Sequence, residues 1–305
     1  MPFELTILGS SSATPTSERY PTAQVLNALG RFFLIDCGEG TQIQIRRQKI
    51  GFSKIQHIFI SHLHGDHFYG LIGMISTFNL LGLKKDIHIY SPSQLKDIIQ
   101  PQLEFLKAGL QFNIVFHPLN FKKPQVIYSD KKVEVISFPL KHSINTCGFL
   151  FRELPREANI KKEYVKKYNI PIPEIIKIKR GAGFQTSEGE FIPHEELTTP
   201  PPPPRSYAFC SDTAFYPPVA ETIYGVDLLY HEATFTEELK EWAKNTYHST
   251  AREAAEIAKM ANARQLILGH FSARYKNVSP FLEEARAVFP DTVAAEDGSR
   301  YEVEK

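Results

Sequence analysis

The sequence predicts an α/β fold in which two β-sheets pack face to face under outer helices, an αββα sandwich with an arm inserted into it. Three observations lead to this prediction. Short β-type runs alternate with helical stretches in the first half of the 305 residues, the same pattern returns near the C-terminus, and a segment of different composition separates the halves. A chain of this length with 42% apolar residues can bury one core with an appended subdomain.

The first half contains short apolar runs that end at a glycine or a polar residue, which is typical of β-strands. They are Leu5–Gly9, Arg31–Asp36, Ile55–Ile60, Ile87–Tyr90, Val133–Phe138 and Cys147–Phe151. Between these runs, apolar residues recur near helical spacing over Phe68–Leu81 and Gln94–Leu106. This half therefore predicts one sheet covered by helices, with strands of a second sheet beginning after it.

The composition changes between residues 152 and 205. This segment is rich in lysine, has few apolar pairs, and closes with prolines from 200 to 204. Such a proline run forms an extended, semi-rigid spacer. We therefore interpret 152–205 as an arm inserted within one domain that spans residues 1–305; a solvated surface insertion is the alternative.

Strand signals resume after the insertion, over Tyr207–Cys210, Val226–Tyr230 and Gln265–Leu268. Helices are expected over three further stretches: Thr236–Lys244, Ser249–Ala261 and Pro280–Phe289. The second half therefore repeats the layered pattern of the first.

The charge and cysteine content exclude some classes of protein. The 35 Lys and Arg nearly cancel the 34 Asp and Glu, so a nucleic-acid partner must be met by a local patch and not by a global positive field. Three cysteines at unrelated spacings give neither a disulfide framework nor a cysteine zinc cluster. Glu4 stands where a signal peptide needs a basic start, and no stretch approaches the roughly 18 apolar residues of a membrane span. We expect a cytoplasmic protein with no membrane partner.

The most informative stretch is Ser61-His62-Leu63-His64-Gly65-Asp66-His67, directly after the apolar run that ends at residue 60. Three imidazoles and a carboxylate within six residues cannot share one face of a helix or strand. In a tight loop, with Gly65 free to adopt unusual backbone angles, they can diverge around two adjacent metal ions. Imidazole suits Zn²⁺, and a carboxylate suits a bridging or second position. The alternative is a polar loop in which histidines cluster by chance, and that placement is rare.

His-x-His-x-Asp-His after a strand resembles the signature of the metallo-β-lactamase superfamily, whose members carry a later His, an Asp and a final His, each at a strand end. This sequence supplies His142, Asp212 and His270 in that order, each after an expected strand. The resemblance implies the metallo-β-lactamase αββα sandwich and two Zn²⁺ per subunit. The implied ligands are His62, His64 and His142 for one zinc, Asp66, His67 and His270 for the other, and Asp212 as the bridge between them.

Further stretches resemble one family of this superfamily, ribonuclease Z. They are Gly9–Pro15, Asp36–Thr41, His231-Glu232-Ala233-Thr234, His248-Ser249-Thr250 and His270-Phe271-Ser272-Ala273-Arg274-Tyr275. The similarity runs in order along nearly the whole chain. It implies a homodimeric, zinc-dependent endoribonuclease that removes the 3′ trailer from precursor tRNA and leaves a 3′-hydroxyl. It also implies that 152–205 is an exosite that binds tRNA, as its lysines would attract an RNA backbone.

Phosphodiester hydrolysis needs an activated water, a stabilised phosphate and a protonated leaving oxygen. Zinc lowers the pKa of a bound water to near neutrality, and the resemblance implies that Asp66 accepts the proton of that water. His248 is the candidate general acid, because imidazole titrates near the operating pH. Glu232 could hydrogen-bond His248 and hold it protonated.

Three residues are candidate substrate contacts. Arg274 could bind phosphate in a bidentate manner, with Ser272 and Thr250 beside it. The alternative for this loop is structural: His248 would then lie on the surface at a helix N-terminus, with Ser249 or Thr250 as the helix cap.

Two other functions stay open. A phosphodiesterase of the same fold that acts on small or cyclic phosphodiesters would have the same zinc site but no need of a lysine-bearing arm. A zinc-stabilised nucleic-acid binding protein without catalysis would not need a complete set of catalytic ligands. The insertion also departs from the arm of ribonuclease Z, whose Gly-Pro is represented only by Ile172-Pro173, and Pro15–Tyr20 only partly matches the family's basic loop.

Overall fold

The structure is a computed structural model, and it describes residues 1–104 and 109–305. The chain divides into two compact units. Unit 1 comprises Met1–Arg152 and Arg205–Glu304, and unit 2 is the inserted segment Glu153–Pro204. Within the described ranges, no helix combines the length and the apolar character needed to cross a membrane.

The first sheet of unit 1 combines an antiparallel part with a parallel part. Its strands are β1 (Phe3–Gly9), β2 (Ala23–Ala28), β3 (Arg31–Ile35), β4 (Ile55–Phe59), β5 (Ile87–Ser91), β6 (Ile114–Pro118) and β18 (Arg300–Glu302). They are arranged in the order β18-β1-β2-β3-β4-β5-β6, antiparallel from β18 to β3 and parallel from β3 to β6. The helices of this half are α1 (Thr41–Arg47), α2 (Gly65–Phe68), α3 (Leu71–Leu80) and α4 (Gln94–Glu104).

The second sheet is assembled from both halves of the chain. Its strands are β7 (Gln125–Ser129), β8 (Val133–Pro139), β9 (Cys147–Glu153), β14 (Ser206–Cys210), β15 (Leu228–Glu232), β16 (Gln265–Gly269) and β17 (Thr292–Ala294). Their order is β17-β16-β15-β14-β9-β8-β7, and β14 to β17 run parallel. The helices that follow β14 are α8 (Val219–Thr222), α9 (Lys240–Asn245), α10 (Ala251–Met260) and α11 (Ser279–Arg286).

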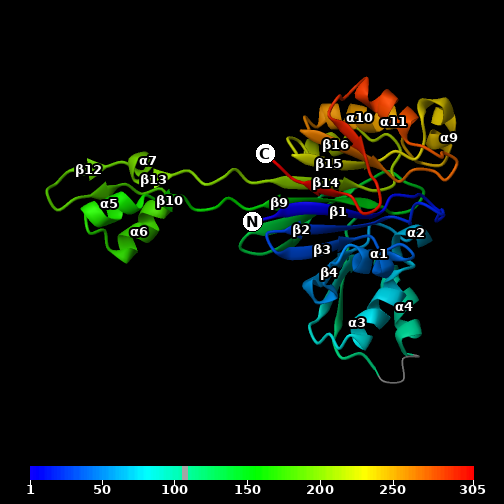
Figure 1. The fold of residues 1–305 in the computed structure, drawn as a ribbon, viewed down its shortest axis with the longest axis horizontal. Coiled ribbons are helices and arrows are strands. Elements are labelled where there is room, and N and C mark those ends of the chain that lie inside the picture. The colour runs from blue at the N-terminus through cyan, green and yellow to red at the C-terminus, as the bar shows by residue number, and fades with distance from the viewer. Residues whose placement is uncertain (105–108) are drawn as a thin grey trace. The chain divides into compact units, whose positions relative to one another are not determined.

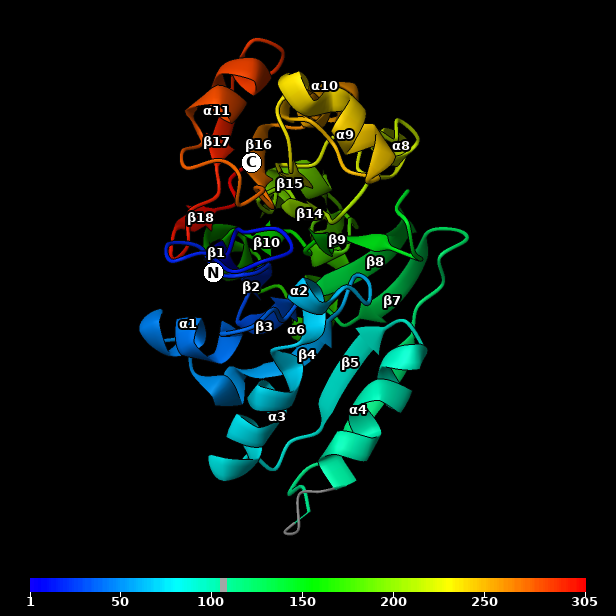
Figure 2. The same ribbon diagram turned by 90° about the vertical axis from the view of Figure 1, so that its right-hand side faces the viewer.

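Three apolar cores separate the layers of unit 1. In β3, Phe33 and Ile35 lie in the core between the sheets, whereas Leu34 packs in the core that holds residues of α3 and α4. In β15, Tyr230 faces the first core and Leu229 faces a third, which includes α10 and α11. These helices cover the outer faces of the two sheets (Figures 1 and 2). The expected αββα fold is confirmed. The central strands β14 and β16 are nearly continuous apolar runs because both of their faces are buried.

Most expected elements occur with shifted ends, and one expected helix is interrupted. The helix expected over Phe68–Leu81 is split into α2 and α3, because the Gly70 amide donates to the Cys37 carbonyl at 2.9 Å. A Cβ at Gly70 would lie 2.1 Å from the Gly38 carbonyl oxygen, so this close approach requires glycine. The helix expected over Thr236–Lys244 is a 3₁₀ turn followed by α9. Residues 105 and 106 of the helix expected over Gln94–Leu106 lie outside the described residues.

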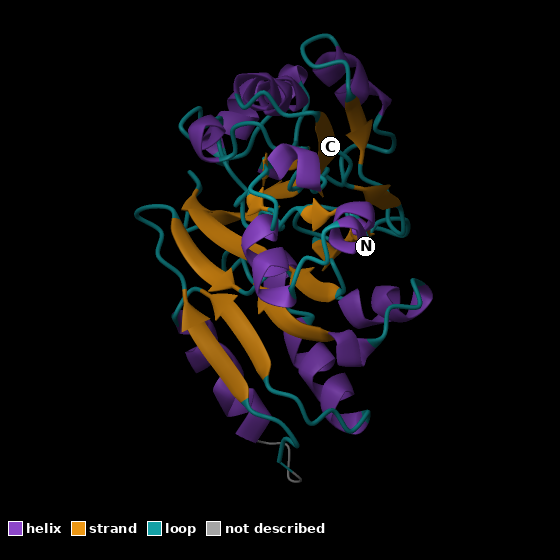
Figure 3. Cartoon of the chain, turned by 90° about the vertical axis from the view of Figure 1, so that its left-hand side faces the viewer, coloured by secondary structure: helices purple, strands orange, loops and turns teal. Residues whose placement is uncertain are grey.

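Unit 2 has secondary structure and a small core of its own. It contains three short helices, α5 (Lys162–Lys167), α6 (Ile172–Lys179) and α7 (His194–Leu197), most easily found by their labels in Figure 1. It also contains two two-stranded ribbons, β10 (Asn159–Ile160) with β13 (Thr198–Thr199) and β11 (Phe184–Gln185) with β12 (Phe191–Ile192). Figure 3 distinguishes helices, strands and loops of the chain by colour. Ile170, Ile178, Ile192 and Leu197 form its buried centre. The segment is therefore a folded insertion and not only a solvated run of charges.

Candidate active site

The expected ligands gather at the carboxyl ends of strands from both sheets. Because β14, β15 and β16 run parallel, their carboxyl ends meet at one edge of the second sheet. Asp212 and His270 follow β14 and β16 there, and His142 follows β8. The loop that carries His62 follows β4 of the first sheet. Ends of neighbouring strands in a layered α/β fold are where binding sites are usually built.

The first group of donor atoms comes from His62, His64, His142 and Asp212. The Nδ1 atom of His64 lies 3.1 Å from Nε2 of His62 and 3.1 Å from Nε2 of His142. Oδ2 of Asp212 lies 3.6 Å and 3.8 Å from the same two Nε2 atoms. Burial lowers the pKa of His62, His64 and His142, so these imidazoles are neutral, which is the form that ligates metal.

The second group comes from Asp66, His67 and His270, and it shares Asp212 with the first. Oδ1 of Asp212 lies 3.3 Å from Nε2 of His67 and 3.3 Å from Nε2 of His270. Oδ2 of Asp66 lies 3.5 Å and 3.4 Å from the same nitrogens. Each oxygen of Asp212 therefore faces a different group, which is the arrangement of a bridging carboxylate.

These donors fit metal ions. Nitrogen or oxygen ligands held tetrahedrally at 2.0–2.1 Å from a metal lie about 3.4 Å from one another, close to the separations found here. Nε2 of His67, Nε2 of His270 and Oδ1 of Asp212 are buried without a hydrogen-bond partner among the described residues. Buried polar atoms are rarely left unpaired, and three of them aimed at one point are accounted for when a cation lies between them.

A second layer of hydrogen bonds fixes the orientation of the ligating rings. Nδ1 of His67 lies 2.7 Å from Oδ2 of Asp36, and Nδ1 of His142 donates to the Tyr247 carbonyl at 2.9 Å. The Ser61 backbone amide also donates to Asp36, at 2.8 Å. Sequence reasoning assigned no role to Asp36, although it opens the Asp-Cys-Gly-Glu-Gly-Thr stretch. Its positive φ of 53° turns the carboxylate out of β3 toward the site.

Glu232 and His248 form a hydrogen-bonded pair beside the metal ligands. The carboxylate of Glu232 is fully buried and lies 2.9 Å from Nδ1 of His248. It also accepts the backbone amides of Thr213 at 3.1 Å, Thr234 at 2.9 Å and Ser249 at 3.1 Å. The hydroxyl of Thr234 donates to it as well, at 2.8 Å. So many donors hold this carboxylate ionised and in one position.

The pair determines the charge of His248. Burial alone would lower the pKa of this imidazole, but the charge and hydrogen bond of Glu232 outweigh it and raise the pKa to about 9. For Glu232, burial raises the pKa and the His248 charge lowers it, with a net decrease. His248 is therefore protonated at neutral pH, with Nδ1 engaged by Glu232, and its ring lies 5.4 Å from that of His270, centroid to centroid.

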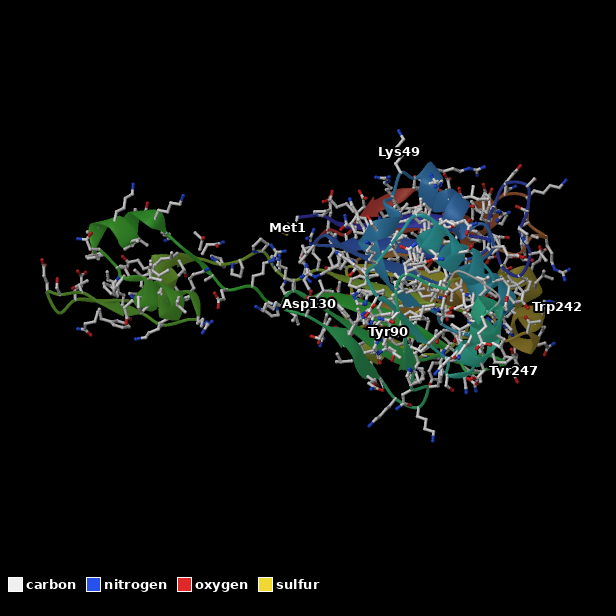
Figure 4. The ribbon with its side chains drawn as sticks, turned by 90° about the horizontal axis from the view of Figure 1, so that it is seen from below. Met1, Lys49, Tyr90, Asp130, Trp242 and Tyr247 are labelled. Carbon is white, nitrogen blue, oxygen red and sulfur yellow. The ribbon has the colours of Figure 1, made fainter. Side chains whose placement is uncertain are left out.

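A pocket of about 600 Å³ opens over this centre, and its walls include Asp66, His248, Ser272 and Arg274. The guanidinium of Arg274 lies 5.3 Å above the ring of Trp242, which is half exposed. Trp242 lies at an outer edge of unit 1 in Figure 4. An arginine that is held at a pocket mouth by an aromatic face can still direct its N–H groups at a phosphate.

Thr250 does not reach this pocket, contrary to the expectation of a substrate contact. Its side chain is fully buried and caps α10: the hydroxyl accepts the Glu253 amide, and the Glu253 carboxylate accepts the Thr250 amide. The same hydroxyl donates to Glu237 at 2.6 Å. The single hydroxyl hydrogen is therefore used on Glu237, so none is left to donate to a phosphate oxygen.

Comparison with known proteins places the chain among hydrolases of this fold. Family models match two parts of it: one described as Anti-Pycsar protein Apyc1 matches residues 3–157, and one described as Beta-lactamase superfamily domain matches residues 202–271. The chain is 50% identical to Ribonuclease Z of Bacteroides thetaiotaomicron over 295 residues, which is 97% of this chain and 93% of that protein. It is 49% identical to Ribonuclease Z of Bacteroides fragilis, with 97% of each chain covered. The crystal structure of human tRNase Z, short form, superposes with a TM-score of 0.72 at 27% identity, covering 99% of this chain and 100% of that one.

Proposed function

The chain belongs to the ribonuclease Z family of the metallo-β-lactamase superfamily, and we propose that it is a zinc-dependent endoribonuclease that removes the 3′ trailer from precursor tRNA and leaves a 3′-hydroxyl. One observation carries the proposal: a carboxylate-held, protonated imidazole, His248, lines the same pocket as two adjacent groups of metal ligands. A site that only stores metal has no use for a general acid.

The residues of this chain would hold two Zn²⁺, one in each group of donors with Asp212 shared. Bound zinc supplies Lewis acidity, which makes water a nucleophile near neutral pH and stabilises phosphate charge. The donor set supports zinc, because five imidazoles and two carboxylates without cysteine suit a borderline metal.

Asp66 is proposed to accept the proton of the attacking water. Its Oδ2 accepts the backbone amide of Ala13 at 2.7 Å, which fixes the carboxylate at the pocket wall. Ala13 has a positive φ of 53°, so the loop is held in an unusual conformation to deliver this amide. A fixed carboxylate accepts a proton in one direction without reorganisation during the reaction.

His248 is proposed to protonate the departing 3′ oxygen. With Nδ1 engaged by Glu232, Nε2 is the atom that can deliver a proton to a substrate in the pocket. Arg274 and Ser272 are the proposed phosphate contacts. After the transfer, the buried Glu232 carboxylate favours reprotonation of the ring.

The test is incubation of the purified, zinc-loaded protein with a precursor tRNA that carries a 3′ trailer, with both new ends mapped. We expect a cut just after the discriminator base, with a 3′-hydroxyl on the tRNA. Robust hydrolysis of a small phosphodiester without any cleavage of precursor tRNA would instead support a phosphodiesterase for small or cyclic substrates. Zinc binding without either activity would support a nucleic-acid binding protein.

Unit 2 is proposed to act as the tRNA-binding exosite. Arg152 and Ser206 are paired across β9 and β14, so a two-residue turn can replace residues 153–205 while preserving the sheet. We expect this deletion to lower kcat/KM for precursor tRNA on the order of a hundredfold, the loss of one of two linked binding sites. Hydrolysis of a small chromogenic phosphodiester should be unchanged.

A second variant tests the exosite without removing it. Lys162, Lys166 and Lys167 are exposed on α5. Their joint replacement by glutamine should lower the affinity for precursor tRNA and make that affinity less dependent on salt concentration. Equal loss of both activities in the deletion variant would contradict the exosite.

The homodimer and the cytoplasmic location stay predictions, to be checked by light scattering and by fractionation.

A further inference from the structure

A second cleft adjoins the active site on the other side of His142. It has a volume of about 430 Å³ and shares His142 with the ligand set. Lys122 and Lys141 line it, and Phe121 and Tyr216 contribute aromatic surface. Neither Asp nor Glu is among the described residues that line it.

The two lysines are available to bind an anion. Both side chains are exposed, and neither ammonium has an ion-pair partner in residues 1–104 and 109–305. The backbone of Lys141 is fixed on both sides, since its amide donates to the Thr213 hydroxyl at 3.1 Å and its carbonyl accepts the Ala214 amide at 2.8 Å. The Lys122 amide donates to the Asn120 side chain at 2.9 Å. Ammonium groups without an ion-pair partner, carried by residues whose backbones are fixed, are suited to bind the phosphates of a nucleic-acid strand.

We propose that this cleft binds the single-stranded trailer, the nucleotides downstream of the cut. The inference rests on the proposed function. Cationic groups interleaved with aromatic faces are the usual means of binding single-stranded RNA without sequence preference.

The position of the general acid determines which side of the cut lies in which cleft. His248 protonates the 3′ oxygen of the upstream nucleotide and lines the first pocket, so the tRNA end occupies that pocket. The downstream strand must leave the centre by another opening. The cleft that shares His142 provides one that is polar, basic and free of carboxylates.

The experiment compares Lys122→Ala/Lys141→Ala with wild type on precursor tRNAs whose trailers have one or six nucleotides. We expect KM for the six-nucleotide trailer to rise about tenfold and its salt slope to fall by about 1.4, because each phosphate contact contributes about 0.7 for a single strand. KM for the one-nucleotide trailer should not change. The matched control is Lys131→Ala/Lys132→Ala, which removes two exposed lysines from the turn between β7 and β8.

Binding without cleavage provides an independent measurement. Fluorescence anisotropy of a labelled, 5′-phosphorylated hexauridylate, titrated with zinc-loaded protein, should show tighter binding to wild type than to Lys122→Ala/Lys141→Ala. Equal affinities, or equal KM increases for both trailers, would overturn the cleft proposal. If wild type cleaves neither precursor, the proposed function fails, and the hexauridylate comparison still decides whether the cleft binds single-stranded RNA.

Discussion

Replacing Asp212 with alanine is expected to empty the metal centre and to lower cleavage on the order of a thousandfold or more. Its two oxygens face different groups of ligands, at 3.3 Å from His67 and His270 and at 3.6 Å from His62. Several kcal/mol of transition-state stabilisation depend on the metals, and each 1.4 kcal/mol corresponds to about tenfold in rate.

Metal content and kcat should be measured together for this variant. Inductively coupled plasma analysis after dialysis should show less zinc than in wild type, whereas Asp97→Ala, an exposed substitution on α4, should match wild type in both. A thermal melt supplies a third readout: zinc should raise the Tm of wild type and raise that of Asp212→Ala less, because ligand binding stabilises the state that binds it. Wild-type zinc content with full activity would show that Asp212 is not the bridge.

Several core strands were predictable because burial on both faces leaves a continuous apolar run. β14 and β16 both show this pattern, and both were expected within one residue of their ends. The central strand β2 was not expected, since Gln24 and Asn27 interrupt its apolar run. β6 and β7 were not expected, since they lie at the edges of the two sheets and their side chains are only partly buried. An edge strand pairs on one side only, so packing places weaker limits on its composition.

The residues proposed as metal ligands could be selected from the sequence for a different reason: several chemically specific residues recur in order at strand ends, and the structure brings their donor atoms together. Asp36 contacts His67, and the Thr234 hydroxyl lies 2.9 Å from Nδ1 of His270 and 3.2 Å from Nδ1 of His248. Each is a lone polar residue in the sequence, and a lone polar residue carries no such pattern. The substrate role expected for Thr250 was wrong because its motif is also a helix cap, and only the contact with Glu253 distinguishes the two roles. The local sequence thus indicated the residue types of the centre, but not the hydrogen bonds that Asp36, Thr234 and Thr250 make around it.

Replacing His248 with alanine is expected to lower kcat for precursor tRNA by about 10²- to 10⁴-fold, the usual contribution of a general acid, with zinc content unchanged. The pKa of about 9 means that the acid form is present below that pH and is lost as the pH rises through it. Wild-type kcat should therefore fall on the alkaline side, and the variant should lack this limb. Bound zinc ions, as nearby cations, would move the limb to below pH 9. His117→Ala on β6, outside the site, is the matched control.

The leaving group distinguishes general-acid catalysis from a merely structural role. A nitrophenolate departs without protonation, so a bis(nitrophenyl) phosphate should be hydrolysed by His248→Ala at a rate close to that of wild type. The 3′ oxygen of a nucleotide is a far poorer leaving group, so nearly the whole loss of rate should appear on precursor tRNA. Glu232→Gln should act in the same direction, because an amide does not hold the imidazole protonated, and its alkaline limb should move to lower pH. Equal losses on both substrates would mean that His248 supports the structure of the site, and an unchanged rate on precursor tRNA would remove it from the mechanism.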